Sequence, residues 1–474
     1  MRLSGSSVIN LRPTLPSLPF EALLRQWMDA AFEPAECRRR LERLMEQKKL
    51  SPALFNPEEI EKGGRPATNA LLFDSFASPA RDWTLFAQVK RGPEVLRAGA
   101  RLPIASVPWV AQLLRAASYS DDVDTLRAMV ASGLPGKLGQ VFNACLEPAE
   151  DEAEYGAWPV VDAPGIYRRE HASLVIRSQT TTLLFDPQIF TLGESTHFSR
   201  YPRESGPIEP DAILITHPHE DHWHVPAILR HVANRNIPII VPVVPRPNLL
   251  TPEDFASSLG QVGLDARAVP WGDTVKVGDI EIDVLPFYGE QPTRCAPGPA
   301  EGLRCWGNCY RVTCPQFSAL ILVDSGVDPL GDMVEAVRQS TARRGPVDVV
   351  LANCRSFPEG INVGLPQYAM TLPFERLRAM YAENAGGRWL SMTLGGPGVA
   401  EACIAAQARY FLPYAHMFRG LGRDAEDDTL AGIRAGLAQR GAATEVLAWN
   451  PGDVARFDGA RLGLQHVEAP RKAA

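Results

Sequence analysis

The sequence lacks the features of a membrane or disulfide-stabilised protein. No segment approaches the ~18 consecutive apolar residues that a membrane-spanning helix needs. The first ten residues also lack the apolar core of a signal peptide. Eight cysteines in 474 residues do not make a disulfide framework. We therefore expect a cytoplasmic protein with no membrane partner.

The sequence also has no excess of positively charged residues. The chain has 55 acidic and 48 basic residues, for a formal net charge of −7. This balance argues against nucleic acid as the main partner, because such partners are held by clusters of Lys and Arg. The composition, with 45% hydrophobic and 22% charged residues, is that of an ordinary globular protein. The length predicts two or three domains with ample core.

The N-terminal third contains no histidine, since the first one is His171. Residues 1–155 instead show helix-like apolar spacing, which predicts a mainly helical N-terminal domain for docking or dimerisation, including a possible homodimer. A pure scaffold role fits equally well. The acidic run at 147–154 predicts a solvated linker. The segments with helical spacing are Phe20–Met28, Ala35–Lys48, Pro93–Arg97, Val107–Ser118 and Val123–Met129.

From about residue 160 to 474, short apolar strands alternate with helical patterns, which predicts a layered α/β domain. The predicted strands are 172–177, 181–185, 212–215, 239–244, 319–323, 347–351, 389–393 and 445–457, with a meander over 268–286. The predicted helices are 225–233, 331–343, 373–385, 399–407 and 429–439.

Four side chains that can bind metals lie within six residues. His217, His219, Asp221 and His222 directly follow the apolar run at 212–215. Imidazole and carboxylate ligands suit Zn, Fe and Mn. Alternation along an extended loop points residues 217, 219 and 221 to one side and residue 222 away. One ion cannot take all four, so the spacing predicts two adjacent metals; the alternative is a His-rich surface loop.

Further ligands are expected where other strands end. Asp324 closes the apolar run 319–323 and opens into a glycine turn. A buried carboxylate there needs a strong partner, and two cations supply one, although Asp also favours turns. His416 follows the apolar run 410–415 and is the predicted closing ligand. Its alternative role is a packed histidine that is bonded to a backbone carbonyl.

In this order, the residues resemble the metallo-β-lactamase superfamily over roughly residues 165–466. The resemblance rests on His217-x-His219-x-Asp221-His222, followed by Asp324 and His416. Asp186, which closes the strand at 181–185, matches the first motif of the superfamily. The resemblance implies an αββα sandwich with a metal cleft at one edge. It also implies that Asp186 supports the loop that carries His217 to His222, the predicted metal loop.

One ligand of the superfamily's hydrolases is missing from the sequence. These enzymes place a third histidine beyond the loop, but this chain has none between His231 and His416. The matching segment, 284–292, offers Glu290. A carboxylate there favours a metal that cycles between +2 and +3, and its change between one-oxygen and two-oxygen binding opens a position for O2. Alternatively, Glu290 pairs with Arg294 or Arg304 and leaves the site one ligand short.

The ligand pattern and domain order are similar to those of the diiron β-hydroxylase family of chloramphenicol biosynthesis. The resemblance implies a non-haem diiron oxygenase, a hydroxylase or N-oxygenase, in which Glu290 and Asp221 are catalytic. Its partners would be O2, an external electron donor such as a ferredoxin or flavoprotein reductase, and a small-molecule or carrier-bound substrate. The implied ligands are His217, His219, Glu290 and Asp324 on one iron, and Asp221, His222, Asp324 and His416 on the other.

The main alternative, from a different class, is a dizinc hydrolase of an ester, amide or phosphodiester, in which the metals activate a bridging water that Asp221 orients. Glu220 and His224 flank the ligands and are candidates for supporting them or carrying protons. His171 either lies near the metals or is structural. Three clustered cysteines, Cys305, Cys309 and Cys314, lack Cys-x-x-Cys pairs, which favours packed thiols over a third metal site or a redox role.

Overall fold

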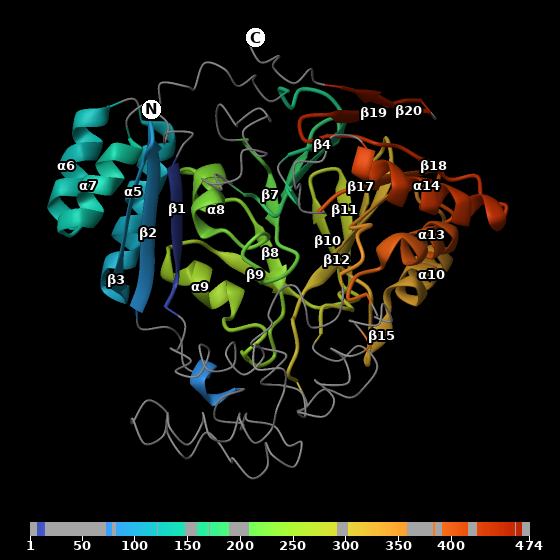
Figure 1. Cartoon of the computed structure of the whole chain (residues 1–474), viewed down its shortest axis with the longest axis horizontal. Coiled ribbons are helices and arrows are strands. Elements are labelled where there is room, and N and C mark those ends of the chain that lie inside the picture. Colours follow the sequence, from blue (N-terminus) through green and yellow to red (C-terminus); the bar gives the residue numbers. More distant parts are fainter. Residues whose placement is uncertain are drawn as a thin grey trace.

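Two large β-sheets face each other in the computed structural model, with helices on both outer faces (Figure 1). The structure describes residues 7–14, 73–77, 82–120, 122–146, 159–169, 171–188, 208–291, 302–357, 383, 391–415, 424–459 and 461–466. Among these residues, no helix is long and apolar enough to cross a membrane. The predicted αββα sandwich is confirmed.

The first sheet has eight strands in the order β20-β19-β4-β5-β6-β7-β8-β9. Strands β6 to β9 run parallel, so their carboxyl ends lie at one edge. The outer face is covered by α8 (Val225–Val232) and α9 (Phe255–Gln261). The strands are β4 (Gly165–Arg168), β5 (Leu174–Arg177), β6 (Thr182–Phe185), β7 (Ala212–Leu214), β8 (Ile239–Pro242), β9 (Ala266–Val269), β19 (Val454–Asp458) and β20 (Arg461–Gln465).

The second sheet has seven strands in the order β10-β11-β12-β13-β16-β17-β18, of which β13, β16, β17 and β18 are parallel. Its outer face is covered by α10 (Met333–Arg344), α13 (Gly395–Ala406) and α14 (Asp424–Gln439). A short hairpin, β14 (Val327–Asp328) and β15 (Gly331–Asp332), precedes α10. The strands are β10 (Thr274–Val277), β11 (Ile280–Pro286), β12 (Asn308–Thr313), β13 (Ser318–Val323), β16 (Val349–Ala352), β17 (Tyr410–Pro413) and β18 (Glu445–Val446).

The strand that leads into the metal loop is buried on both faces. In β7, Ala212 and Leu214 pack into the core between the two sheets. Ile213 and the following Ile215 face the opposite way, into a second core under α8 and α9. A parallel strand covered on both sides is expected to be a continuous apolar run, and the sequence Ala-Ile-Leu-Ile is such a run.

The N-terminal unit combines a sheet with helices. β1 (Ser7–Pro13), β2 (Asp82–Arg91) and β3 (Glu94–Pro103) form an antiparallel sheet. The 3-10 turns η2 (Asp74–Phe76) and η3 (Ile104–Ser106) and the helices α5 (Val107–Tyr119), α6 (Val123–Gly133) and α7 (Gly136–Cys145) complete its described part. Figure 1 shows this unit beside α8 and α9, with which it shares the second core.

The helix predictions for this unit were partly correct. The helices predicted at 107–118 and 123–129 are confirmed as α5 and α6. The helix predicted at Pro93–Arg97 is wrong, because these residues lie in the turn and strand that pair with β2. The "mainly helical" expectation therefore missed a three-stranded sheet. The segments 20–28, 35–48 and 147–154 lie outside the described residues.

Most element predictions for the second part are confirmed, including the hairpin β5–β6 and helices α8, α10, α13 and α14. The meander over 268–286 is wrong in one respect. β9 belongs to the eight-stranded sheet, whereas β10 and β11 pair in the other sheet. The chain therefore crosses between layers at residues 270–273. The predicted helix at 373–385 and strand at 389–393 lie mostly outside the described residues.

Candidate metal centre

The metal loop begins where β7 ends and is tied to both sheets. The backbone N–H of Ile215 donates to Ile240 (2.9 Å), beside β7 in the first sheet. From the second sheet, the Tyr310 hydroxyl donates to the carbonyl of Ile215 (2.6 Å), and the N–H of Asn308 donates to Thr216 (2.7 Å). The loop thus lies across the gap between the sheets at the carboxyl ends of the parallel strands.

Asp186, the residue after β6, fixes this loop through hydrogen bonds. Its carboxylate accepts hydrogen bonds from the Thr216 backbone N–H (2.7 Å), the Thr216 hydroxyl (2.5 Å) and His222 Nδ1 (2.9 Å). Complete burial raises the pKa of Asp186, while the bonds from His222 and Thr216 lower it. Because Nδ1 of His222 is bonded to Asp186, its other nitrogen, Nε2, faces the site.

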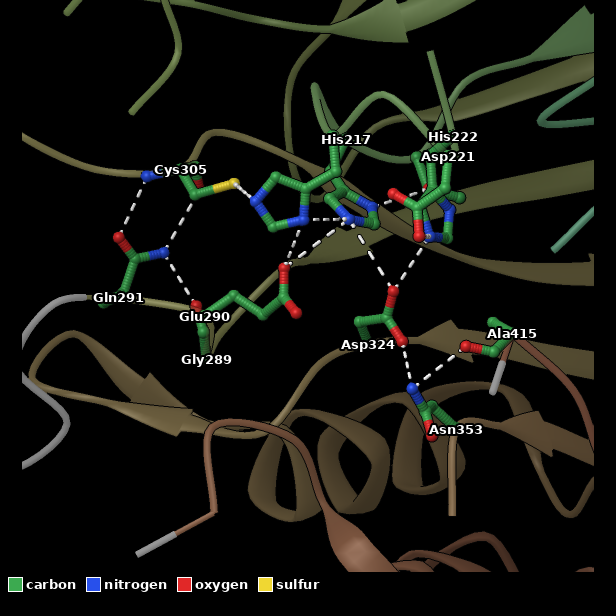
Figure 2. Close-up of polar contacts among 12 residues, drawn as sticks. His217, Asp221, His222, Gly289, Glu290, Gln291, Cys305, Asp324, Asn353 and Ala415 are labelled. Carbon is green, nitrogen blue, oxygen red and sulfur yellow. Dashed lines mark hydrogen bonds and ion pairs between the residues drawn. The ribbon is translucent and has the colours of Figure 1, made fainter. Parts of the chain in front are cut away.

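The first group of potential ligands consists of His217, His219 and Glu290. Glu290 Oε2 lies 2.8 Å from His219 Nδ1. It also lies 3.5 Å from His217 Nε2 (Figure 2). The side chain of Glu290 is only 8% exposed, yet Oε2 has no aligned hydrogen-bond partner among the described residues. A buried carboxylate oxygen facing two imidazole nitrogens is the arrangement that a cation would satisfy.

The second group consists of His217, His222 and Asp324. Asp324 Oδ2 lies 2.9 Å from His222 Nε2 and 3.7 Å from His217 Nε2. His222 Nε2 also lacks an aligned hydrogen-bond partner among the described residues, despite this proximity. Asp324 therefore stands between the first histidine and the last, where one carboxylate can serve two metals.

Asp221 lies beyond His222, with Oδ2 at 3.9 Å from His222 Nε2. Its Oδ2 is also 2.9 Å from Nε2 of His171, in the turn between β4 and β5. These three residues form a third group with ligand-capable atoms within 4.8 Å of one another. The sequence had left open whether His171 lies near the metals, and the structure places it against two of the predicted ligands, Asp221 and His222.

The charges of the cluster are mutually dependent. Burial lowers the pKa of His217 well below its usual value. Burial also acts to lower the pKa values of His219 and His222, but nearby carboxylates, Glu290 and Asp221 first among them, raise both well above the usual value. Burial raises the pKa of Glu290, opposed by His219. Metal cations bound here would compete with protons for the imidazole nitrogens and would offset the charge of the buried carboxylates.

The backbone around the site is locally strained. Seven non-glycine residues in the described part of the chain have a positive φ. Ala233 and Gln407 lie away from the site. The other five are His171 (49°), Asp186 (39°), Glu290 (50°), Val323 (46°) and Ala415 (58°). Each of the five is a residue of the site or directly precedes a predicted ligand, and such strained positions cluster at functional sites.

The structure brings together most of the residues predicted for the site. It does so for His217, His219, Asp221, His222, Glu290, Asp324 and Asp186. His416 lies outside the described residues, which end at Ala415 in this segment. Glu290 does not pair with Arg304, because that guanidinium bonds Asp328 (2.6 Å) and the carbonyl of Phe287 (2.7 Å). Arg294 lies outside the described residues.

Two of the predicted supporting residues face the N-terminal unit. Glu220 is largely exposed and forms an ion pair with Arg12 of β1. His224 caps α8 by accepting a hydrogen bond from the N–H of Ala227 (3.2 Å). Burial lowers the pKa of His224 to about 4, opposed by a hydrogen bond with the Ile9 backbone. Both residues thus join the metal loop to β1, and no contact in the described part of the chain joins either to a metal ligand's side chain.

Sequence reasoning missed two residues that contact predicted ligands. Asn353, after β16, donates through Nδ2 to Asp324 Oδ1 (2.5 Å) and to the Ala415 carbonyl (3.0 Å). Its signal was a polar residue that ends an apolar strand. Cys305 places Sγ 3.9 Å from His219 Nε2. The side-chain amide of Gln291 fixes Cys305 by donating to its carbonyl and accepting from its backbone N–H (Figure 2). No sequence pattern indicated the contact between Cys305 and His219.

The three clustered cysteines do not form a common site. Cys309 and Cys314 are buried, and their thiols contact the carbonyls of Leu322 and Phe317. Together with the buried Cys305, they match the prediction of packed thiols.

Comparisons with known proteins agree with this geometry. Residues 181–313 match the beta-lactamase superfamily domain. A 4-amino-L-phenylalanyl 3-hydroxylase of Streptomyces venezuelae, whose substrate is held on the CmlP peptidyl carrier protein, is 28% identical over 228 residues. That match covers 46% of this chain and only 40% of the relative.

The solved structures extend the likeness to the whole fold. CmlA, a diiron beta-hydroxylase from Streptomyces venezuelae, aligns with a TM-score of 0.58 at 17% identity, over 94% of this chain and 98% of that one. A single-residue variant of CmlA aligns with a TM-score of 0.55 at 18% identity and the same coverage. The chain thus has a metallo-β-lactamase fold. Its fold is similar to that of CmlA from the N-terminal unit onward.

Proposed function

We propose that the protein is a non-haem diiron oxygenase, a hydroxylase or N-oxygenase of a biosynthetic pathway. The observation that carries the proposal is Glu290. A buried carboxylate, with Oε2 lacking an aligned partner in the described residues, stands against His217 and His219 where the superfamily's hydrolases use a third histidine. Adding a carboxylate favours a harder, redox-active metal over zinc.

The donor set fits two metals. His217 Nε2, His219 Nδ1 and Glu290 would hold one ion, while Asp221 and His222 Nε2 would hold the other. Asp324 would be shared. We propose His416 as the closing ligand of the second ion. The strained Ala415, held through its carbonyl by Asn353, directly precedes it in the chain.

Two bound irons would supply the activation of O2, and the chain supplies the surroundings. His217 and His222 are fully buried, and Phe287 stacks on the His217 ring with centroids 4.9 Å apart. Such an apolar wall excludes water from one side of the site, which protects reactive chemistry from side reactions. Glu290, whose Oε2 faces both His219 and His217, would change between one-oxygen and two-oxygen binding at this position.

The electron balance of the reaction indicates the electron donor, and the hydroxylase relative indicates the kind of substrate. Inserting one oxygen atom of O2 into a substrate and reducing the other to water consumes two electrons and two protons. We therefore propose an external donor such as a ferredoxin or flavoprotein reductase. The relative acts on an aminoacyl group held by a peptidyl carrier protein. We propose a carrier-bound or small-molecule amine-containing acyl substrate for this chain, with the N-terminal unit available for docking or a homodimer.

Metal analysis of the aerobically purified protein, together with its near-ultraviolet spectrum, tests the proposal. We expect about two irons per chain, with oxo-to-iron charge-transfer bands that disappear on reduction with dithionite. O2 readmitted to the reduced protein should restore the bands. Two zincs per chain, no such bands and hydrolysis of ester, amide or phosphodiester probes would instead establish the dizinc hydrolase.

A further inference from the structure

His171 occupies an unusual place for a residue in a hairpin turn. It lies between β4 and β5, in a turn that the Arg169 N–H closes onto the Ser173 carbonyl (2.9 Å). Turns of this kind generally face solvent. His171 is instead only 3% exposed, and its φ of 49° is in the left-handed region that non-glycine residues enter at a cost of about 1–2 kcal/mol.

The ring of His171 is directed at the second half of the metal centre. Its Nε2 lies 2.9 Å from Asp221 Oδ2, a hydrogen-bond distance. Its edge meets the ring of His222, with centroids 5.3 Å apart and planes at 69°. The turn conformation therefore has a specific result, which is contact with two predicted ligands of the same metal.

Asp221 is the ligand that most needs support. Its side chain is 34% exposed, whereas those of Glu290 and Asp324 are 8% exposed. In the part of the chain that the structure describes, His171 is the hydrogen-bond partner of the Asp221 carboxylate. Without it, solvent would compete for Asp221 and the carboxylate could rotate away from His222.

We propose that His171 is a positioning residue for the second metal. Its Nε2–H donates to Oδ2 of Asp221 and keeps this carboxylate facing His222 and Asp324. The role rests on the proposed dinuclear centre, but it is the same whether the ions are iron or zinc. Hydrogen bonds of this kind to ligands commonly change metal affinity by about 10–100-fold when they are removed.

Stepwise titration of the metal-free protein with Co²⁺, followed by visible absorption, tests the role without any substrate. Wild type should bind two Co²⁺ per chain. His171→Leu should bind the first ion normally and the second with affinity lowered about 10–100-fold. His171→Gln, which keeps an N–H donor near the position of Nε2, should stay within a few-fold of wild type.

A control histidine lies outside the site. His231, on α8, is equally buried and accepts a hydrogen bond from the Ile208 N–H (3.0 Å). His231→Gln should keep both Co²⁺ affinities. Thermal melting of each metal-free variant shows that it is folded. If His171→Leu does not fold, His171→Phe, which keeps a ring against His222 but has no N–H donor, takes its place with the same expected loss.

Three outcomes would overturn the proposal. Equal loss of the second ion in His171→Gln and His171→Leu would make His171 a direct ligand. Wild-type affinity in both variants would leave it a purely structural residue. A wild-type chain that binds fewer than two Co²⁺ would overturn the dinuclear centre itself, a failure that is distinguishable because it precedes any substitution.

Discussion

Asn353 donates a hydrogen bond from its side-chain amide to Oδ1 of Asp324, the oxygen that faces away from the histidines. The same amide bonds the carbonyl of Ala415. One side chain therefore fixes the proposed bridging carboxylate and the segment that precedes His416. The two residues end neighbouring parallel strands, β13 and β16, which explains why their side chains meet.

Replacing Asn353 with Ala should impair metal binding and stability together. A hydrogen bond to a charged group is worth about 1.5–3 kcal/mol, so we expect that loss in the free energy of unfolding, measured with urea. Metal content should fall below two ions per chain. Asn248 is a matched control, since it is buried and bonds the Arg246 and Gly302 carbonyls away from the site. Asn248→Ala should destabilise the chain without lowering its metal content; equal metal loss would contradict the assignment.

Exchanging Glu290 for His should separate the two candidate chemistries. It restores the ligand type of the superfamily's hydrolases and removes one negative charge. We expect the variant to retain two metals, to take up zinc in preference to iron, and to lose O2-dependent reoxidation after reduction. Stopped-flow absorption measures the reoxidation. Unchanged reaction with O2 would contradict a role for the carboxylate.

Removing the Asp186 carboxylate should lower the free energy of unfolding more than removing one of its hydrogen-bond donors. Asp186→Ala leaves the Thr216 N–H, the Thr216 hydroxyl and His222 Nδ1 without their buried acceptor. We expect a loss of about 3–5 kcal/mol in unfolding free energy, as for a broken buried charged network. Thr216→Val, which removes only the hydroxyl, should lose about 1 kcal/mol. Similar losses in the two variants, measured by urea unfolding, would show that Asp186 does not organise the loop.

Glu253 should give the metal-free protein a specific pH dependence. Burial raises its pKa to about 7, although bonds with Ser258 and Trp223 lower it. A carboxyl whose folded pKa is raised contributes stability below its unfolded pKa, near 4.5, and loses it as the pH rises through 7. Glu253→Gln removes this loss. Its unfolding free energy relative to wild type should rise by up to about 3 kcal/mol between pH 4.5 and 7.

The control for this titration is an exposed carboxylate. Glu335, on α10, has a side chain that is 48% exposed. The difference in unfolding free energy between wild type and Glu335→Gln should change little over the same pH range, because surface pairs contribute little. A flat profile for Glu253→Gln would show that this carboxyl is not effectively buried.

The ligand loop could be predicted because its information is local. His217 to His222 lie within six residues after an apolar run, so residue types alone predicted both the strand and the loop. Glu290 was not predictable locally: the superfamily resemblance implies a third ligand beyond the loop, and no histidine lies between His231 and His416 to supply it. The N-terminal sheet was less accessible. Residues 93–97 fit a helical spacing, but pairing with the alternating strand at Trp83 to Val89 makes them a strand.

The amino-acid sequence alone thus determined the buried strand β7 and the cluster of predicted ligands after it. Only the tertiary structure decided which distant residues support the predicted ligands. His171 reaches Asp221 because β4 and β5 form a hairpin beside β6, and Asn353 reaches Asp324 because β16 lies next to β13. Strand order is set by long-range packing between whole sheets, and no local pattern of residues encodes it.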